Sequence, residues 1–167
     1  MYFQGPAVVI VSCVQDTPMP GTTNKYRIHP HRIVGSKLNC QHGVCKLDVN
    51  PNDMTATFNH IGIQCVTRRE IEAELKVRKS INVDPFFCGF DSNNVTFNLN
   101  MLRLAFQVFL RPHQGGTYPV PDIPVSRIIK DKKSHSDLQI LNYSENESPF
   151  EGEYALPIYC SCPKYVY

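Results

Sequence analysis

The sequence NHIGIQCVTRREIEAELKVRKSINVDPF, residues 59–86, decides the fold because its hydrophobic pattern changes period partway along. In the first part, Ile61, Ile63 and Cys65 alternate with other residues. This period of two is typical of a strand with those three side chains on one face. From Thr67 onward, apolar residues recur at spacings of three and four, which predicts a helix. We therefore expect a strand that leads directly into a short helix.

The predicted helix has a defined beginning and end. Thr67 and Glu70 have the spacing of a capping box, in which two side chains bond to backbone amides at the helix start. Ile71 and Leu75 form the apolar stripe. The charged residues expected on the opposite side of the helix are Lys76, Arg78 and Lys79. The helix must end before Asp84-Pro85, because the residue that precedes a proline is pushed out of the helical region.

Two adjacent arginines, Arg68 and Arg69, occupy the first turn of this helix. Positive side chains at a helix N-terminus oppose the helix dipole, so their presence there needs a reason. A phosphate group would supply one, since backbone amides and guanidinium groups would converge on the same anion. The alternative is an ordinary solvated face, on which Glu72 is the partner of the arginines within the helix.

The rest of the chain has the pattern of short strands separated by turns. The clearest strand is 102–110, where Leu102, Phe106 and Val108 fall on one face and Ala105 on the other. The other expected strands are 7–14, 44–49, 54–58, 125–129 and 138–141. Many short strands with one helical insertion predict an all-β fold, an antiparallel β-sandwich.

Length and composition limit the classes of protein that fit. A chain of 167 residues is one domain, or one domain and a fragment. The formal charge of +2 is by itself weak evidence for a nucleic-acid partner. No run approaches about 18 consecutive apolar residues, so no membrane span is expected. The seven cysteines do not have the spacing of a disulfide framework, and we expect free thiols in a reducing compartment.

Neither a metal site nor a catalytic site is expected. The residues that could be considered as a zinc cluster are Cys40, His42 and Cys45, with His29 and His31 nearby. They lack the paired short spacings of structural zinc sites. His60 near Cys65 is the only local pairing of a base with a nucleophile, and strand alternation there indicates ordinary packing. No glycine-rich phosphate loop is present, so we expect neither an enzyme nor a cofactor.

The same central segment resembles a known family. GIQCV, a basic pair and a charged helix that ends in VDPF are similar to the Rel homology domain of the NF-kappa-B, Rel and Dorsal transcription factors, with the insect Dorsal branch closest. The flanking strings that agree in the same order are AVVIVSCV (7–14), HPHRIVG (29–35), GVCKLDV (43–49), LNMLRLAFQVFL (99–110) and DKKSHSDLQI (131–140). The resemblance therefore covers residues 6–141 with few gaps.

The resemblance implies an immunoglobulin-like β-sandwich and a division of the chain into three parts. Residues 1–5 look like a protease-site scar or a truncated start, and residues 6–141 like a partial Rel homology DNA-binding domain. Residues 142–167 match the linker and the first strand of a second immunoglobulin-like domain, which makes the dimer in this family. A strand without its own sheet is expected to be poorly ordered or adhesive.

The resemblance also implies which residues bind. In the family, a lysine pair at the position of the two arginines contacts the DNA backbone, which favours the phosphate interpretation. The linker that follows the first domain also lies along DNA and carries cations. The residues expected to bind the DNA backbone are Arg68, Arg69, Lys132 and Lys133. Gln139 and Asn142 depart from the pattern, because NF-kappa-B members often have lysine or arginine there.

The implied function is that of a sequence-specific DNA-binding transcription factor, which regulates transcription by RNA polymerase II in immune or developmental signalling. Such a factor binds kappa-B-type DNA as a Rel-family homo- or heterodimer. An ankyrin-repeat inhibitor holds it in the cytoplasm, and a signal releases it to the nucleus. The alternative is a short interaction module that binds a Rel partner or an ankyrin-repeat inhibitor without reading DNA. A secreted immunoglobulin-like protein also stays open, with sequons at Asn94, Asn142 and Asn146.

The family reads bases with a loop of the type R-x-R-Y-x-C-E-G-x-S-A-G-S, and no such string occurs in these 167 residues. We therefore expect this chain to bind duplex DNA without sequence preference, because phosphate contacts carry no sequence information. The other donors that could reach a groove are Arg27, His29, His31 and Arg32.

Overall fold

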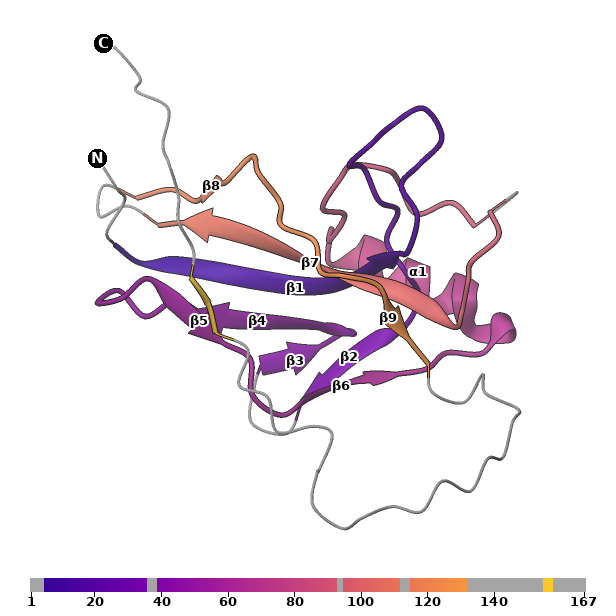
Figure 1. The fold of residues 1–167 in the computed structure, drawn as a ribbon, viewed down its shortest axis with the longest axis horizontal. Coiled ribbons are helices and arrows are strands. Elements are labelled where there is room, and N and C mark those ends of the chain that lie inside the picture. Colours follow the sequence, from indigo (N-terminus) through magenta and orange to yellow (C-terminus); the bar gives the residue numbers. More distant parts are fainter. Residues whose placement is uncertain (1–4, 36–38, 93–94, 112–114, 132–154, 158–167) are drawn as a thin grey trace.

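The computed structural model describes residues 5–35, 39–92, 95–111, 115–131 and 155–157. Figure 1 shows antiparallel strands with a helix packed beside them. The strands are β1 (Ala7–Gln15), β2 (Arg32–Gly35), β3 (Asn39–Gln41), β4 (Val44–Asp48), β5 (Thr55–Thr57), β6 (Ile61–Gln64), β7 (Met101–Leu110), β8 (Tyr118–Pro119), β9 (Ile129–Lys130) and β10 (Ala155–Pro157). The helical segments are the 3-10 turn η1 (Arg68–Glu70) and α1 (Ile71–Ser80).

The larger sheet is built around the pairing of β1 with β7. These strands run antiparallel, from Ala7 opposite Leu110 to Gln15 opposite Leu102. The strand order is β3-β4-β1-β7-β8, and β9 pairs with the first residues of β7. Both long strands were predicted from the sequence, because their apolar residues continue over enough positions to exclude a turn.

A smaller layer faces one side of this sheet and encloses the main core. It consists of the antiparallel pairs β2–β6 and β5–β10. The core residues are Ala7, Val9, Val11 and Cys13 of β1, with Ile33, Cys45, Val49, Ala56, Phe58, Leu102 and Val108. The predicted antiparallel sandwich is therefore confirmed.

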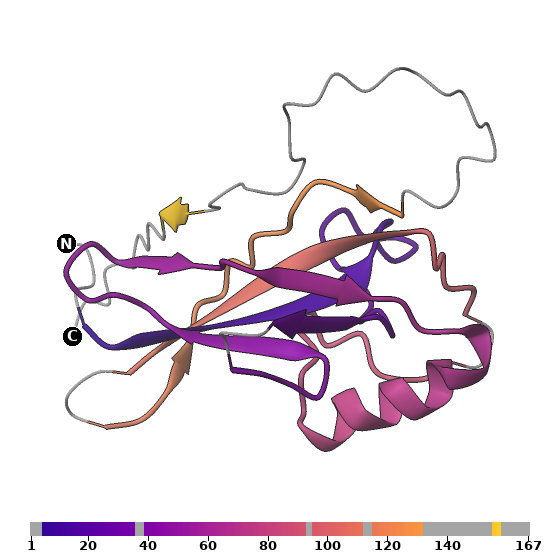
Figure 2. The same cartoon turned by 90° about the horizontal axis from the view of Figure 1, so that it is seen from below.

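The opposite side of β1 and β7 packs against the helix and the loops around it. This second core contains Val14 and Ala105 from the sheet and Leu75 from α1. The other buried members are Ile28, Val44, Val83 and Phe97. Figure 2 shows α1 lying beside one end of the strands. Leu75 is buried as the predicted apolar stripe requires, and Ile71 is partly buried against the same cluster.

Two details of the predicted strand before the helix differ from the structure. Ile61 and Ile63 alternate with exposed neighbours as predicted, but β6 ends at Gln64. Cys65, which was expected on the same face as the isoleucines, is exposed, and Val66 is buried instead. The period of two fails there because the chain has already left the strand.

The expectation of free thiols is wrong for two of the cysteines. Cys40 lies opposite Cys45 in the β3–β4 hairpin, and the two sulfur atoms form a disulfide. Side chains directly opposite each other on neighbouring strands are close enough to bond, but the hairpin register that pairs them is not visible in the spacing of the cysteines. Cys13, Cys65 and Cys88 are free.

Several predicted segments fall wholly or partly outside the described residues. The strand expected at 138–141 lies there, as do Lys132 and Lys133. Of the strand expected within 142–167, Ala155–Pro157 forms β10 and pairs with β5, so at these three residues the expected uncovered strand has a partner. In the described part of the chain, none of the helices has the length and apolar character needed to cross a membrane.

Candidate nucleic-acid interface

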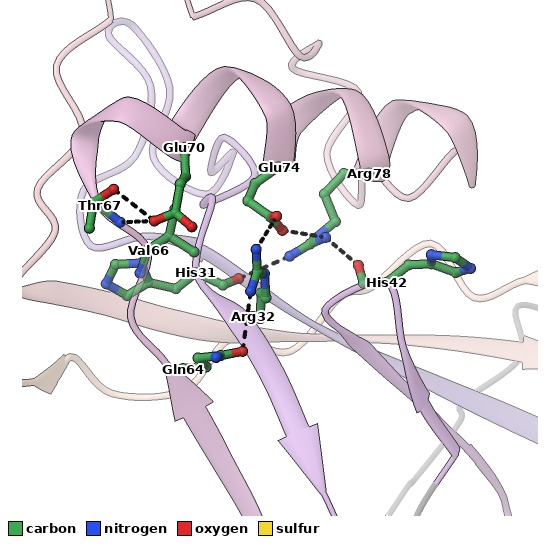
Figure 3. A network of polar contacts seen from close by, with 9 residues as sticks. All are labelled: His31, Arg32, His42, Gln64, Val66, Thr67, Glu70, Glu74 and Arg78. Atoms are coloured by element: carbon green, nitrogen blue, oxygen red, sulfur yellow. Dashed lines mark hydrogen bonds and ion pairs between the residues drawn. The ribbon is translucent and has the colours of Figure 1, made fainter.

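The chain turns from strand into helix at Thr67, and this turn is held by a capping box. The Glu70 carboxylate accepts hydrogen bonds from the Thr67 backbone amide at 2.9 Å and from the Thr67 hydroxyl at 2.7 Å. The same two bonds lower the pKa of Glu70, because they stabilise its charged form. The predicted helix start is therefore confirmed, and the Glu70 charge is used within the turn (Figure 3).

Arg68 and Arg69 form the first two residues of η1, and both are exposed. Among the residues that the structure describes, neither has an ion-pair partner. Glu72, the intrahelical partner that the alternative interpretation requires, pairs with Lys76 at 2.7 Å instead. The arginines are thus two uncompensated charges at the positive end of the helix, an arrangement that favours an external anion.

Arg78 corrects the predicted solvent-facing side of the helix. It was expected among the charged residues opposite the apolar stripe, but its side chain is only 1% exposed. Its guanidinium donates to the carbonyl oxygen of His31 at 3.2 Å and to that of His42, and it forms an ion pair with Glu74. The buried charge is tolerated because the surrounding carbonyls and the carboxylate satisfy its donors. Sequence periodicity could not show those carbonyls, because they come from distant segments.

Glu74 bridges two arginines and thereby ties the helix to the sheet. One carboxylate oxygen lies 2.6 Å from Arg32 of β2, and the other lies 3.5 Å from Arg78. The hydrogen bond from Arg32 is the main cause of the lowered pKa of Glu74. Arg32 also donates to the side chain of Gln64 on β6, at 3.4 Å. Figure 3 shows this chain of contacts running from β6 through β2 to the middle of α1.

Gly43 has no side chain, and the Arg78 guanidinium occupies the space where one would lie. It lies at the tip of the β3–β4 hairpin with φ of +72°, and a Cβ built there would overlap the guanidinium. A left-handed backbone without a Cβ is the conformation that glycine adopts at little cost. The hairpin can therefore approach the helix closely enough for the His42 carbonyl to accept from Arg78.

His31 holds the residue that precedes the cap. The Val66 backbone amide donates to His31 Nδ1 at 3.2 Å, and His31 Nε2 donates to the carbonyl oxygen of Leu99 at 2.9 Å. His29 accepts from the His31 amide at 3.1 Å and contacts the Asn98 carbonyl, also at 3.1 Å. Each imidazole thus accepts at Nδ1 and donates at Nε2, which is one neutral tautomer. Burial lowers the pKa of His29 to about 3 and also lowers that of His31.

The hydrogen bonds of His29 and His31 correct the expectation that these residues could reach a DNA groove, and the disulfide bears on the considered zinc cluster. His29 and His31 are 0% and 2% exposed, so they are not available to reach a DNA groove as the sequence suggested. Of the residues considered as a zinc cluster, Cys40 and Cys45 are bonded to each other, so neither sulfur is a free thiolate ligand. In the described part of the chain, no group of three or more His, Cys, Asp or Glu side chains could hold a metal ion.

The residue that leads to the second predicted basic pair is held close to Cys65, three residues before Arg68. Lys132 and Lys133 lie outside the described residues, but the residue before them, Asp131, is described. Its side chain lies 3.9 Å from the Cys65 sulfur, and its backbone amide donates to the Asn100 carbonyl at 2.8 Å. Lys130, an exposed residue of β9, is a further cation of this basic segment that was not among the predicted DNA contacts. Only the pairing of β9 with β7 reveals its place.

Comparisons with known proteins agree on the family. A model of the Rel homology DNA-binding domain matches residues 1–132. The chain is 44% identical over 163 residues to embryonic polarity protein dorsal of Drosophila melanogaster, which covers 95% of this chain and 15% of that protein. It is 33% identical over 153 residues to transcription factor p65 of Gallus gallus, with 90% of this chain and 26% of p65 covered.

A solved structure is also similar. The structure of the Dorsal homologue Gambif1 bound to DNA matches with a TM-score of 0.69 and 42% identity, over 78% of this chain and 73% of that one. The curated relatives are much longer than the chain, which spans 15% of dorsal, 26% of p65 and 27% of the RelB homolog of Gallus gallus.

Proposed function

This chain belongs to the Rel homology DNA-binding domain family, and on that premise we propose that it binds the phosphate backbone of duplex DNA. The proposed contacts are Arg68, Arg69, Lys132 and Lys133. The observation that carries the proposal is the pair of exposed guanidinium groups at a capped helix start, without ion-pair partners among the described residues. A similar domain, that of the Dorsal homologue Gambif1, has been solved bound to DNA.

The two adjacent guanidinium groups favour phosphate over other biological anions. A guanidinium fork matches phosphate oxygens in a bidentate geometry, and two adjacent forks suit a ligand with repeated charges. Asp131, the residue before the two proposed lysines, lies beside Cys65, which precedes Arg68 by three residues, and this supports a shared surface for the two basic parts of the chain. Duplex DNA offers phosphates along its whole length and can engage both parts together.

We further propose that the protein from which this domain comes is a transcription factor of the NF-kappa-B, Rel and Dorsal type. Kappa-B-type DNA, a Rel-family dimer partner and an ankyrin-repeat inhibitor are its proposed partners, and it moves between cytoplasm and nucleus. The similarity to dorsal and p65 supports this proposal. Residues 6–141 are proposed as the DNA-binding domain, and 142–167 as the linker and first strand of a second domain. We also propose a role as a binding protein rather than an enzyme, which the same similarity supports.

The experiment that tests DNA binding is a salt titration of the 167-residue chain on a duplex. Arg68→Ala combined with Arg69→Ala removes two proposed phosphate contacts. Since each contact contributes ~0.9 to the slope of log K against log salt, the slope should fall by about 1.8. Affinity should fall alike for every duplex sequence, because the lost contacts read no bases.

A control removes the same net charge from α1, the helix that follows the arginine turn. Lys76→Ala with Lys79→Ala eliminates two exposed lysines farther along α1 and should leave the slope near that of the wild type. If both double variants reduce the slope equally, the effect is one of net charge, and the proposed site is wrong. A loss confined to one duplex sequence would also contradict the proposal.

A further inference from the structure

We propose that His31 is a positioning residue for DNA binding, because its imidazole holds the segment that presents Arg68 and Arg69. The inference rests on the proposed function and deepens it. Its starting point is that the two arginines have no ion-pair partners of their own among the described residues. Whatever orients them must therefore act on the backbone that leads into their turn.

The contact that orients this backbone is the bond from the Val66 amide to His31 Nδ1, at 3.2 Å. Val66 lies two residues before Arg68 and is 4% exposed, so its amide is shielded from water. After Gln64 the chain has left β6 and has not yet entered the helix. The imidazole is therefore the acceptor that fixes the backbone between the two elements.

The same ring also bonds to the loop before β7, whose next residue holds Asp131. His31 Nε2 donates to the Leu99 carbonyl, and the neighbouring Asn100 carbonyl accepts from the Asp131 amide at 2.8 Å. One buried side chain thus connects the residue before the arginine turn with the loop on which residue 131 is held. Its own backbone is fixed in turn by the bond from Arg78 to the His31 carbonyl.

The ring is well suited to this role because it bonds in two directions at once. A neutral imidazole offers one acceptor and one donor that point in different directions within one rigid plane. His29 supports the arrangement by accepting the His31 amide, and the two rings meet edge to face with centroids 4.5 Å apart. Asparagine and glutamine can each reproduce only one side of this geometry, which makes a test possible.

The test compares two substitutions in the 167-residue chain. His31→Asn places an amide oxygen near the position of Nδ1 and can keep the Val66 bond. His31→Gln places its amide near the position of Nε2 and keeps a donor for Leu99, but leaves the Val66 amide without its acceptor. We expect His31→Gln to weaken duplex binding about threefold to tenfold and to lower the salt slope by roughly one unit. His31→Asn should remain within about twofold of the wild type.

Two further variants separate positioning from general destabilisation and from failure of the proposed function. Val49→Ala, in the core of the sandwich, should lower the melting temperature without changing the slope. His31→Gln added to the Arg68→Ala and Arg69→Ala variant should cause little further loss, because the arginines it positions are gone. If His31→Gln weakens the affinity of the arginine variant by the same factor as it does in the wild type, His31 acts elsewhere and the inference is wrong.

The outcomes are distinguishable. If the arginine variant loses affinity but His31→Gln binds like the wild type, the positioning role is refuted and the DNA site stands. If the arginine variant binds like the wild type, the proposed site fails and the inference fails with it. If His31→Gln does not fold, hydrogen exchange of the Val66 amide in His31→Asn is compared with its DNA binding. Slow exchange with wild-type binding, or fast exchange with weakened binding, supports the role, whereas fast exchange with wild-type binding, or slow exchange with weakened binding, contradicts it.

Discussion

The imidazoles of His29 and His31 are buried, and the fold disfavours their protonation. Both nitrogen atoms of each ring are used, with Nδ1 accepting from a backbone amide and Nε2 donating to a backbone carbonyl. A proton on Nδ1 would bring two donors together and would place a charge in a buried site. Burial is the main reason that the pKa of His29 falls to about 3, and it lowers the pKa of His31 as well.

These shifts predict how stability depends on pH. The unfolded imidazoles take up protons below about 6.5, whereas His29 stays neutral in the folded protein until about 3. The unfolded state binds more protons in this window. The free energy of unfolding therefore has its highest value above pH 6.5 and falls as the pH drops. The loss should approach ~1.4 kcal/mol per pH unit for each imidazole that stays neutral.

Urea unfolding at pH 7.5, 6.5 and 5.5 measures this dependence. His29→Gln should be less stable at neutral pH but should lose less on acidification, since one of the buried imidazoles is gone. His60→Asn is the control, because His60 is exposed and its φ of +59° is a conformation that asparagine tolerates. Equal pH dependence in wild type and His29→Gln would show that His29 is not the group responsible.

Helix α1 is attached to the sheet by charges as well as by Leu75. Glu74 contacts Arg32 of β2 and the buried Arg78, and Arg78 reaches the carbonyls of His31 and His42. A buried ion pair adds little net stability compared with an apolar contact, but removing one partner leaves the other charge uncompensated. The network therefore matters most for the place at which the helix docks, and with it for the position of the arginine turn.

Two glutamates on this helix allow a direct comparison. Glu74→Gln should lower the free energy of unfolding by on the order of 2–4 kcal/mol, because Arg78 then stays buried without its carboxylate. Glu72→Gln breaks the Glu72–Lys76 pair, whose side chains are 71% and 72% exposed, and should change the free energy of unfolding far less, because solvent screens an exposed pair. Chemical denaturation of both variants gives the two values. Similar losses would mean that the Glu74 contacts are not a structural anchor.

At the scale of the whole molecule, the described residues offer few groups for reading bases. His29 and His31 are buried, Arg32 is held by Glu74, and Arg27 donates to the Asp91 carbonyl at 3.0 Å. All four donors that the sequence nominated for a groove are therefore engaged within the fold. The proposed contacts that remain are to phosphates, whose attraction is the same for every sequence.

We therefore expect the 167-residue chain to bind a kappa-B duplex and a scrambled duplex of equal length with similar affinity. Dissociation constants should lie near or above the non-specific range of ~10⁻⁴ to 10⁻⁶ M at physiological salt. A competition titration measures the ratio. A preference beyond about tenfold would require base contacts from this chain, since one good bidentate pair contributes roughly 1–3 kcal/mol of discrimination.

Much of this architecture follows from the sequence alone. The long apolar strands β1 and β7, the end of the helix before Asp84-Pro85 and the cap at Thr67 were predicted because each depends on residues close together in the chain. Local periodicity and capping chemistry suffice at that range. The arginine pair was identified for the same reason, since its position at the helix start can be read from the cap.

The tertiary structure decided what depends on distant partners. The burial of Arg78, the Cys40–Cys45 disulfide and the engagement of His29 and His31 all depend on strand register or on carbonyl groups from other segments. A charged residue that follows a helical period looks solvated in sequence, because the period identifies its face but not what packs there. The place of Arg68 and Arg69 was therefore visible in the chain, whereas the imidazole that holds their turn emerged only when residues 31, 66 and 99 met in the fold.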